Sequence, residues 1–502
     1  MARANETQKS GIASDVIVLT ASKITASLSV ILLFVLLSRT LSVPDYGSFR
    51  QIWLINKGFI QEVFTLGIPM SLFYFLPSLA RGNRKFFVVQ TLLVLSSLGI
   101  LVAAALYSFS GLLSELFNNP QLERLLKITA LFAMFTLPTL ALEGVLVTFG
   151  RTLVFAVYTI LDRLLLLGMV AASAYWFNSI EALCVTLVVF GSIELTVAIL
   201  IIRSSLKHFR IESRTFNIVE QIRFSLPLGV SNVVGLLNIE LDKVVISSFF
   251  NVSQFAKYAN GAFEVPFLGT VGASVNSVLM PEYVRRHSEG DYQGILRLWH
   301  KAICKVALIF FPLAVFLFVY AEDLVTLLFS DKYIESAVIF RIYLFALLPK
   351  VTWYGIILVA LGHSREPLYG SLIALGANLA LNLTLIQLIG FTGPAIATIL
   401  TTYLVSFYYL HRIRSAFNEN WLAIFPWGVL MRIFLTSAVV GLGFCLPLSL
   451  FYHGNSAIKL LLGGIVYFVP LAVFFRHMGL LSKSDIDLVR EQLNGLRRLL
   501  QR

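Results

Sequence analysis

Charged residues are scarce in this sequence, and their scarcity excludes an ordinary soluble protein. Only 13% of the 502 residues are Asp, Glu, Lys or Arg, whereas 58% are hydrophobic. The mean hydropathy is +0.83. Soluble globular domains carry about 25% charged residues. We therefore expect the chain to lie within a lipid bilayer.

Cysteine and histidine are also scarce. The three cysteines, Cys184, Cys304 and Cys445, each stand alone inside an apolar run, which excludes a disulfide framework and a metal–thiolate site. The seven histidines fall in loops or at the ends of apolar runs, so a histidine proton relay through the membrane is not expected. A Walker-type glycine loop and zinc-ligand spacings are absent as well. The sequence therefore predicts neither ATP hydrolysis nor a cofactor, apart from H⁺ or Na⁺ as a coupling ion.

Long apolar runs are what the sequence has in abundance. Runs of roughly 20 residues or more suffice to cross a bilayer, and they predict about fourteen spans. The first run is much longer than a signal-peptide core of about 7 to 15 residues, so it is predicted to be an uncleaved span. The predicted limits are 12–38, 49–76, 86–109, 125–149, 153–177, 180–202, 222–248, 255–281, 299–320, 335–361, 366–389, 393–413, 426–451 and 456–476.

Basic residues alternate between the predicted loops. Short cytoplasmic loops are enriched in Lys and Arg, and with the N-terminus inside, the inner loops here carry most of them. Both termini are then cytoplasmic, and the net charge of +12 reflects topology rather than nucleic-acid binding. The inner-loop residues include Arg81, Arg84, Lys85, Arg151, Arg203, Lys207, Arg285, Arg286, Arg365, Arg412 and Arg414.

Two halves of the chain repeat one pattern. The segment VPDYGSF (residues 43–49) is matched by VSQFAKY (residues 252–258), and residues 135–152 are matched by residues 345–364. The second match aligns Pro138 with Pro349 and Gly150 with Gly362. Internal symmetry of this kind is typical of secondary transporters whose substrate site lies between the repeats.

The repeat predicts the domain organisation. We expect an N-terminal lobe of six spans over residues 1–205 and a C-terminal lobe of six spans over residues 206–415. Two extra spans follow over residues 416–480. Residues 481–502 have apolar residues at helical spacing and predict an amphipathic helix on the cytoplasmic leaflet.

Charged residues within the predicted spans are the main candidates for a site. A charge at mid-bilayer costs at least about 2.5 to 3.5 kcal/mol and usually faces a cavity or a partner. The residues concerned are Lys23, Lys57, Glu62, Glu143, Asp162, Arg163, Glu194, Glu240, Asp242, Lys243, Glu264, Lys350 and Arg432.

Each of these charges also has a purely structural interpretation. Glu240 and Lys243 are three positions apart and can neutralise each other on one helix face. Asp162 and Arg163 can form a buried pair. Lys23 and Lys57 have no carboxylate three or four positions away, which favours a cavity-lining role. The alternative for these two lysines is an interhelical pair with Glu62 or Glu264.

Three segments carry a resemblance to a known family. LSRTLSVPDYGSF (residues 37–49), SLPLGVSNVVGLLNIELDKVVIS (residues 225–247) and GANLALNLTLIQLIGFTGPAIATILTTYLV (residues 376–405) resemble the polysaccharide-transporter branch of the multidrug/oligosaccharidyl-lipid/polysaccharide exporter superfamily. The resemblance extends over nearly the whole chain. It implies an all-α polytopic protein with two repeat-related six-helix lobes.

The resemblance also implies a function and a site. It implies a flippase of the bacterial inner membrane that moves polyprenyl-diphosphate-linked oligosaccharides, such as O-antigen or capsule repeat units, by alternating access. Its partners would be that substrate, membrane lipids and the polysaccharide polymerase machinery. Spans 1, 2, 7 and 8 would line the cavity. The substrate-binding candidates are Lys23, Lys57, Lys243, Arg163 and Lys350, and the ion-coupling candidates are Glu62, Asp242 and Glu264.

Three other functions stay open. Drug exporters of the same superfamily usually have twelve spans and an acidic site in the first helix, where this chain has Lys23. Lipid II flippases share fourteen spans and a cationic cavity, but their arginine-rich first helix is not found here. A membrane-embedded polysaccharide polymerase or ligase generally needs a sizeable outer domain, and the predicted outer loops are short.

Overall fold

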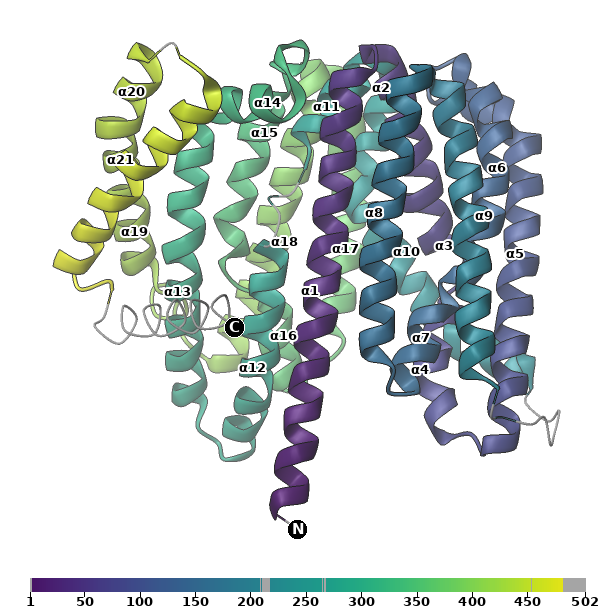
Figure 1. Cartoon of the computed structure of the whole chain (residues 1–502). Coiled ribbons are helices and arrows are strands. Elements are labelled where there is room, and N and C mark those ends of the chain that lie inside the picture. Colours follow the sequence, from purple (N-terminus) through teal and green to yellow (C-terminus); the bar gives the residue numbers. More distant parts are fainter. Residues whose placement is uncertain are drawn as a thin grey trace. The chain divides into compact units, whose positions relative to one another are not determined.

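The computed structural model describes residues 2–207, 209, 217–263, 265, 268–452 and 454–481. Every regular element in this part of the chain is a helix (Figure 1). Eleven of its helical stretches are long and apolar enough to cross a bilayer. A helix satisfies all of its backbone polar groups internally, which hydrocarbon requires. The chain is therefore a polytopic helical membrane protein, as predicted.

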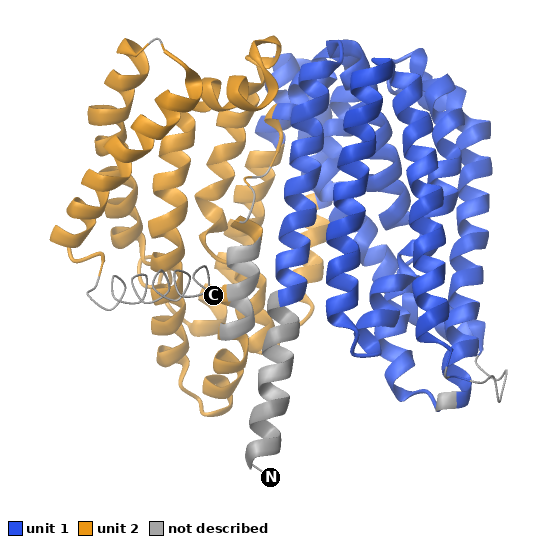
Figure 2. Cartoon of the chain, viewed as in Figure 1, with its two compact units in different colours: residues 1–260, 375–397 blue, residues 261–374, 398–502 orange. Residues whose placement is uncertain are grey.

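The chain divides into two compact units (Figure 2). The first contains Met1–Asn260 and Leu375–Ala397, and the second contains Gly261–Ala374 and Thr398–Arg502. These units are defined by spatial contacts, whereas the lobes predicted at residues 1–205 and 206–415 follow from the repeat. The lobe boundaries stay a prediction, and the predicted tail helix lies outside the described residues.

The first unit contains the helices of the first six predicted spans. It also contains α10, which corresponds to the seventh predicted span. Helix α1 packs along α8, and α6 packs against both α5 and α9 (Figure 1). Side chains of α4, α5, α7 and α9 form one hydrophobic core. The helices are α1 (Ala2–Thr40), α2 (Val43–Trp53), the π-helix η1 (Leu54–Ile60), α3 (Gln61–Val63), α4 (Ile68–Ser78), α5 (Arg81–Leu116), α6 (Gln121–Thr139), α7 (Ala141–Thr148), α8 (Thr152–Phe177), α9 (Ile180–Ser205), α10 (Ile218–Phe249) and α11 (Val252–Gly261).

The second unit contains the other helices with three exceptions: α17 and α18 are divided between the two units, and the short helix at residues 390–392 belongs to the first unit. The described part of this unit begins with α12 (Leu268–Ser288), α13 (Tyr292–Val319), α14 (Ala321–Phe329), η2 (Asp331–Tyr333), α15 (Ser336–Leu344), η3 (Phe345–Leu347), η4 (Pro349–Val351) and α16 (Tyr354–Ala360). The chain continues with α17 (Glu366–Ile389), η5 (Gly390–Thr392), α18 (Gly393–Phe417), α19 (Trp427–Val440), the π-helix η6 (Gly441–Cys445), α20 (Leu446–Phe451) and α21 (Ser456–His477).

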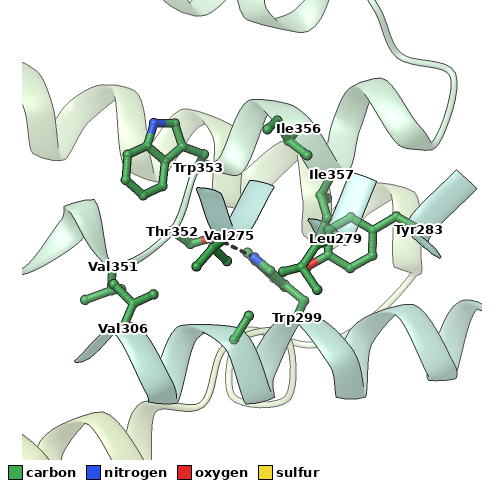
Figure 3. A pocket seen from close by; sticks show the side chains of 11 residues that line it. Val275, Leu279, Tyr283, Trp299, Val306, Val351, Thr352, Trp353, Ile356 and Ile357 are labelled. Carbon is green, nitrogen blue, oxygen red and sulfur yellow. Dashed lines mark hydrogen bonds between the residues drawn. The ribbon is translucent and has the colours of Figure 1, made fainter. Parts of the chain in front are cut away.

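Two predicted spans are not single long helices. The span predicted over residues 255–281 is divided between α11 and α12, and the span predicted over residues 335–361 consists of four short helices. In the latter, Thr352 is extended, with φ −151° and ψ 158°. The indole N–H of Trp299 donates a 2.8 Å hydrogen bond to the Thr352 hydroxyl (Figure 3). Trp299 therefore supplies a polar partner at the break.

The structure supports the alignment of the two repeats in their fourth spans. Helices α7 and α16 both end two residues before a glycine in the left-handed region, Gly150 at φ +68° and Gly362 at φ +86°. In both copies the residue after the glycine donates its N–H to the carbonyl four positions before the glycine, at 2.8 Å. A left-handed glycine with this hydrogen bond is a common way for a helix to end. Residues aligned on sequence alone thus adopt the same local backbone.

Candidate functional site

Lys23 of α1 pairs with Glu143 of α7. Its ammonium lies 2.8 Å from the Glu143 carboxylate, and the two side chains are 62% and 35% exposed. Glu143 belongs to the short helix that follows the helix break at Leu140. The sequence predicts an interhelical pair as the alternative role of Lys23, with Glu62 or Glu264 as the partner. An interhelical pair exists, but its partner is Glu143. Partners on different helices are set by packing, which the spacing along one helix does not reveal.

The face of α1 that carries Lys23 is polar. Thr20, Lys23 and Ser27 lie three and four positions apart, so they share one side of the helix. The Lys23 and Ser27 side chains are exposed, whereas Leu33 and Leu37 further along α1 are buried. An exposed charge within an apolar span faces water more readily than hydrocarbon. This arrangement fits the cavity-lining role expected for Lys23.

Lys57 lies inside the first unit, in a group of four charges. Its ammonium is 5.1 Å from the centre of the Phe132 ring. The charge of Lys57 interacts with those of Glu194, Asp162 and Arg163. These residues come from η1, α8 and α9, helices that are far apart in sequence. Two cations thus share the interior of the unit with two carboxylates.

The two carboxylates in this group are buried. Glu194 is 6% exposed and accepts a 3.1 Å hydrogen bond from the Thr139 hydroxyl. Asp162 is 7% exposed, and its carboxylate lies 3.5 Å from the Arg163 guanidinium, so the predicted pair exists. The four formal charges sum to zero, which favours a structural role for Lys57 and Arg163 over the substrate-binding role predicted for them.

The charges at the C-terminal end of α10 are also paired. Lys243 lies 2.7 Å from Glu240, as the i, i+3 spacing predicts. Asp242 is 1% exposed and accepts a 2.8 Å hydrogen bond from the Tyr258 hydroxyl. The positive charge of Arg50 in α2 repels that of Lys243. Asp242 is therefore held by a tyrosine of α11, whereas Lys243 has its own counter-ion.

Arg50 is a functional candidate that the sequence analysis missed. Its guanidinium donates hydrogen bonds of 2.9 Å to the Asn260 side chain and to the carbonyl of Ala259. It also lies over the Phe34 ring at 4.1 Å. The signal was present, since Arg50 directly follows the repeated segment of residues 43–49, but its position at the end of a span resembles that of a loop charge.

Three other predicted residues belong to different elements or lie outside the described residues. Lys350 belongs to η4 in the second unit and is half-buried. Glu62 belongs to α3 and is exposed. Glu264 lies outside the described residues. The roles predicted for all three stay predictions.

Two hollows differ in size and chemistry. An apolar groove of about 350 Å³ in the first unit is lined mostly by residues of η1 and α5, with one residue of α10; Phe59, Phe109 and Val244 are among them. The pocket beside Trp299 and Thr352 measures about 10 Å³ (Figure 3), which is room for about one water molecule. The groove suits hydrocarbon, and the pocket is too small for a sugar.

The fold defines a polytopic helical membrane protein with charged side chains inside its predicted spans. Residues 36–338 match the family described as polysaccharide biosynthesis protein. This match covers more than half of the chain, and the chain belongs to that family.

Individual relatives are more distant. A probable lipid II flippase MurJ of Rhizobium tropici is 23% identical over 302 residues, which are 56% of this chain and 55% of that protein. The capsular polysaccharide biosynthesis protein CapF of Staphylococcus aureus is 24% identical over 200 residues, 38% of this chain and 48% of CapF. The chain thus spans about half the length of these curated relatives.

The fold is shared with a solved transporter structure. The lipid II flippase MurJ in its inward closed conformation superposes with a TM-score of 0.73, covering 92% of this chain and 99% of that one, at 17% identity. At this identity the likeness concerns the fold alone. It extends over nearly the whole length of both chains, as the resemblance found in the sequence does.

Proposed function

We propose that this protein is a flippase that moves a polyprenyl-diphosphate-linked oligosaccharide from the cytoplasmic to the outer face of the bacterial inner membrane. It works by alternating access and performs no covalent chemistry. The observation that carries the proposal is the exposed Lys23 on a polar helix face within a membrane span. Membership of the polysaccharide biosynthesis family supports the class of substrate.

The physical chemistry of the substrate requires such a polar face. Moving one unpaired hydroxyl into hydrocarbon costs about 4 to 8 kcal/mol, so an oligosaccharide with about ten hydroxyls meets a barrier of tens of kcal/mol. A hydrated, polar-lined path removes most of this barrier. The diphosphate needs cations, and a lysine at about 4 Å gains on the order of 4 kcal/mol at an effective dielectric of 20. The polyprenyl tail stays in the lipid.

The membrane potential favours export in this direction. Each negative charge that moves outward from a negative interior gains about 2.3 kcal/mol per 100 mV. Entry of H⁺ or Na⁺ is the other source of energy, with Glu62, Asp242 and Glu264 as its candidate sites. Replacing the potential by a pH or sodium gradient in proteoliposomes distinguishes these sources.

The orientation is part of the proposal, with both termini in the cytoplasm. Reporter tags at the two ends should both report the cytoplasm. A cysteine at Asp331, in the turn after α14, should react with an impermeant reagent added from outside. Opposite ends, or labelling of that cysteine only from inside, contradict the orientation.

Deletion of the gene tests the class of substrate. The account predicts loss of one surface polysaccharide while its lipid-linked repeat units accumulate on the inner face of the membrane. An enzyme that polymerises or ligates these units gives a different result: the units reach the outer face, and polymer length or attachment changes. A drug exporter leaves the polysaccharide intact and alters drug tolerance.

A lipid II flippase is the second candidate, favoured by the shared fold with MurJ. Lipid II is also a polyprenyl-diphosphate-linked saccharide, so the same polar face suits it. Expression in a strain depleted of its own lipid II flippase separates the two candidates. Growth of that strain supports the second candidate, and failure to grow with normal protein levels supports the first.

A further inference from the structure

Among the described ion pairs of the first unit that have both partners inside the predicted spans, the Lys23–Glu143 pair is the most exposed. The side chains of the Lys243–Glu240 pair are 13% and 21% exposed, and those of the Arg163–Asp162 pair are 22% and 5% exposed. Lys23 and Glu143 are 62% and 35% exposed. An exposed ion pair is weak where water reaches it, because water screens both charges. This pair is therefore the one whose partners exchange most readily.

Glu143 occupies the position that an anion would take at Lys23. Its oxygen lies 2.8 Å from the ammonium, a normal distance for a charge-assisted hydrogen bond to a carboxylate or a phosphate. We infer that Glu143 is an internal counter-ion that the substrate's diphosphate displaces from Lys23. This inference rests on the proposed function and assigns Glu143 a role in specificity.

The position of the pair along the spans fits this role. Glu143 lies five residues before the end of α7, and the basic residue Arg151 follows that end. In the proposed orientation this is the cytoplasmic end of the span. A diphosphate that arrives from the inner leaflet then meets Lys23 in the inner half of its span.

A built-in counter-ion selects between anions. Bulk anionic phospholipids such as phosphatidylglycerol carry one phosphate diester with a single negative charge. A diphosphate carries more charge and more acceptor oxygens, so it competes better with one carboxylate for an ammonium that has three donors. Specificity of this kind comes from penalising the wrong ligand as well as from attracting the right one. Glu143 would thus exclude the abundant lipids at some cost in affinity for the substrate.

Binding to the full-length protein in lipid nanodiscs tests this role. The probe is a fluorescent polyprenyl diphosphate, competed with phosphatidylglycerol. Glu143→Gln should bind the probe up to about fivefold more tightly, the upper end of the range expected for loss of an exposed ion pair. It should also lose discrimination against phosphatidylglycerol. Glu143→Asp keeps the charge and should retain discrimination.

Two further variants complete a double-mutant cycle on Lys23 and Glu143. Lys23→Gln should weaken binding, and the Lys23→Gln and Glu143→Gln double variant should bind like Lys23→Gln alone, because the counter-ion acts only through the lysine. The control is Glu123→Gln, which removes a carboxylate 2.6 Å from Lys127 in another partly exposed pair. It should leave both affinity and discrimination unchanged.

The outcomes separate this inference from the proposed function. If the wild-type protein does not bind the polyprenyl diphosphate, both are wrong. If the wild type binds it but Glu143→Gln changes neither affinity nor discrimination, only the role of Glu143 is wrong. A lower melting temperature of Glu143→Gln with unchanged affinity would show that the pair merely joins α1 to α7.

Discussion

Tyr46 donates a 2.6 Å hydrogen bond to the side-chain oxygen of Asn260, and both residues are fully buried. Tyr46 lies in the first copy of the repeated segment, and Asn260 lies two residues after the second copy. Arg50 donates to the same oxygen of Asn260 at 2.9 Å. The repeat-related helices α2 and α11 are therefore joined by a buried polar cluster.

The first prediction concerns this hydrogen bond. Tyr46→Phe removes the donor but leaves Asn260 its bond from Arg50, so the loss of stability should be about 1 kcal/mol. The measurement is the melting temperature of the purified protein. Tyr175→Phe is the control, because Tyr175 is 83% exposed. Equal melting temperatures for the two variants would contradict the importance of the bond.

The second prediction concerns the close approach of α2 and α11 at Gly47. A Cβ atom on Gly47 would lie 2.3 Å from the carbonyl oxygen of Val252, which is backbone and cannot turn aside. Gly47→Ala should therefore destabilise the protein by about 1 to 3 kcal/mol. Gly168→Ala in α8 is the matched control, because in the described part of the chain no atom beyond its own stretch of helix lies within 4 Å of its Cβ position. That variant should be neutral or slightly stabilising. If Gly47→Ala leaves the stability unchanged, α2 and α11 are further apart in the protein than this structure shows.

The third prediction concerns the charges around Lys57. If Glu194 is its counter-ion, Lys57→Gln and Glu194→Gln should each lower stability, because each leaves a buried charge uncompensated. The double variant should recover part of the loss, with a coupling of about 0.5 to 3 kcal/mol. A substrate ligand behaves differently: Lys57→Gln then abolishes export at normal stability, and Glu194→Gln does not restore it.

The fourth prediction concerns pH and the inner end of α12, beyond the predicted span. Hydrogen bonds from Arg285 and Arg286 lower the pKa of Glu282 to about 2 from its ordinary value of 4.5. A lowered pKa adds stability above the ordinary value, and that stability is lost as the pH falls toward 2. Glu282→Gln should therefore lower the melting temperature equally between about pH 5 and pH 8. The difference from the wild type should shrink only below about pH 4. If the difference in melting temperature between Glu282→Gln and the wild type already varies near pH 7, the lowered pKa of Glu282 is contradicted.

The fold was largely predictable from the sequence because hydrocarbon leaves the backbone few choices. The length of the apolar runs identified the membrane-spanning helices, and a shared pattern of proline and glycine identified the repeat. The paired helix ends at Gly150 and Gly362 agree with that alignment. Splitting of the span over residues 335–361 was not predicted, since its apolar composition alone gives no sign that Thr352 is extended.

For the charged residues within the predicted spans, the pairing partners were harder to predict than the position along the span. The Glu240–Lys243 and Asp162–Arg163 pairs follow from spacing and sequence proximity, and both exist. The Lys23–Glu143 pair joins residues 120 positions apart and depends on how α1 and α7 pack. The partner of Arg50 could not be predicted for the same reason, because Asn260 becomes its partner only when the two repeats meet.

Translocation by the purified protein tests the central claim most directly. The full-length protein is reconstituted in proteoliposomes with a fluorescently labelled polyprenyl-diphosphate oligosaccharide, and an impermeant quencher reports the fraction of label on the outer face. We predict that the protein moves label across the bilayer, and that Lys23→Gln slows this movement at equal protein content. Label that crosses no faster than in protein-free liposomes, under an imposed membrane potential and under imposed H⁺ and Na⁺ gradients, would contradict the account.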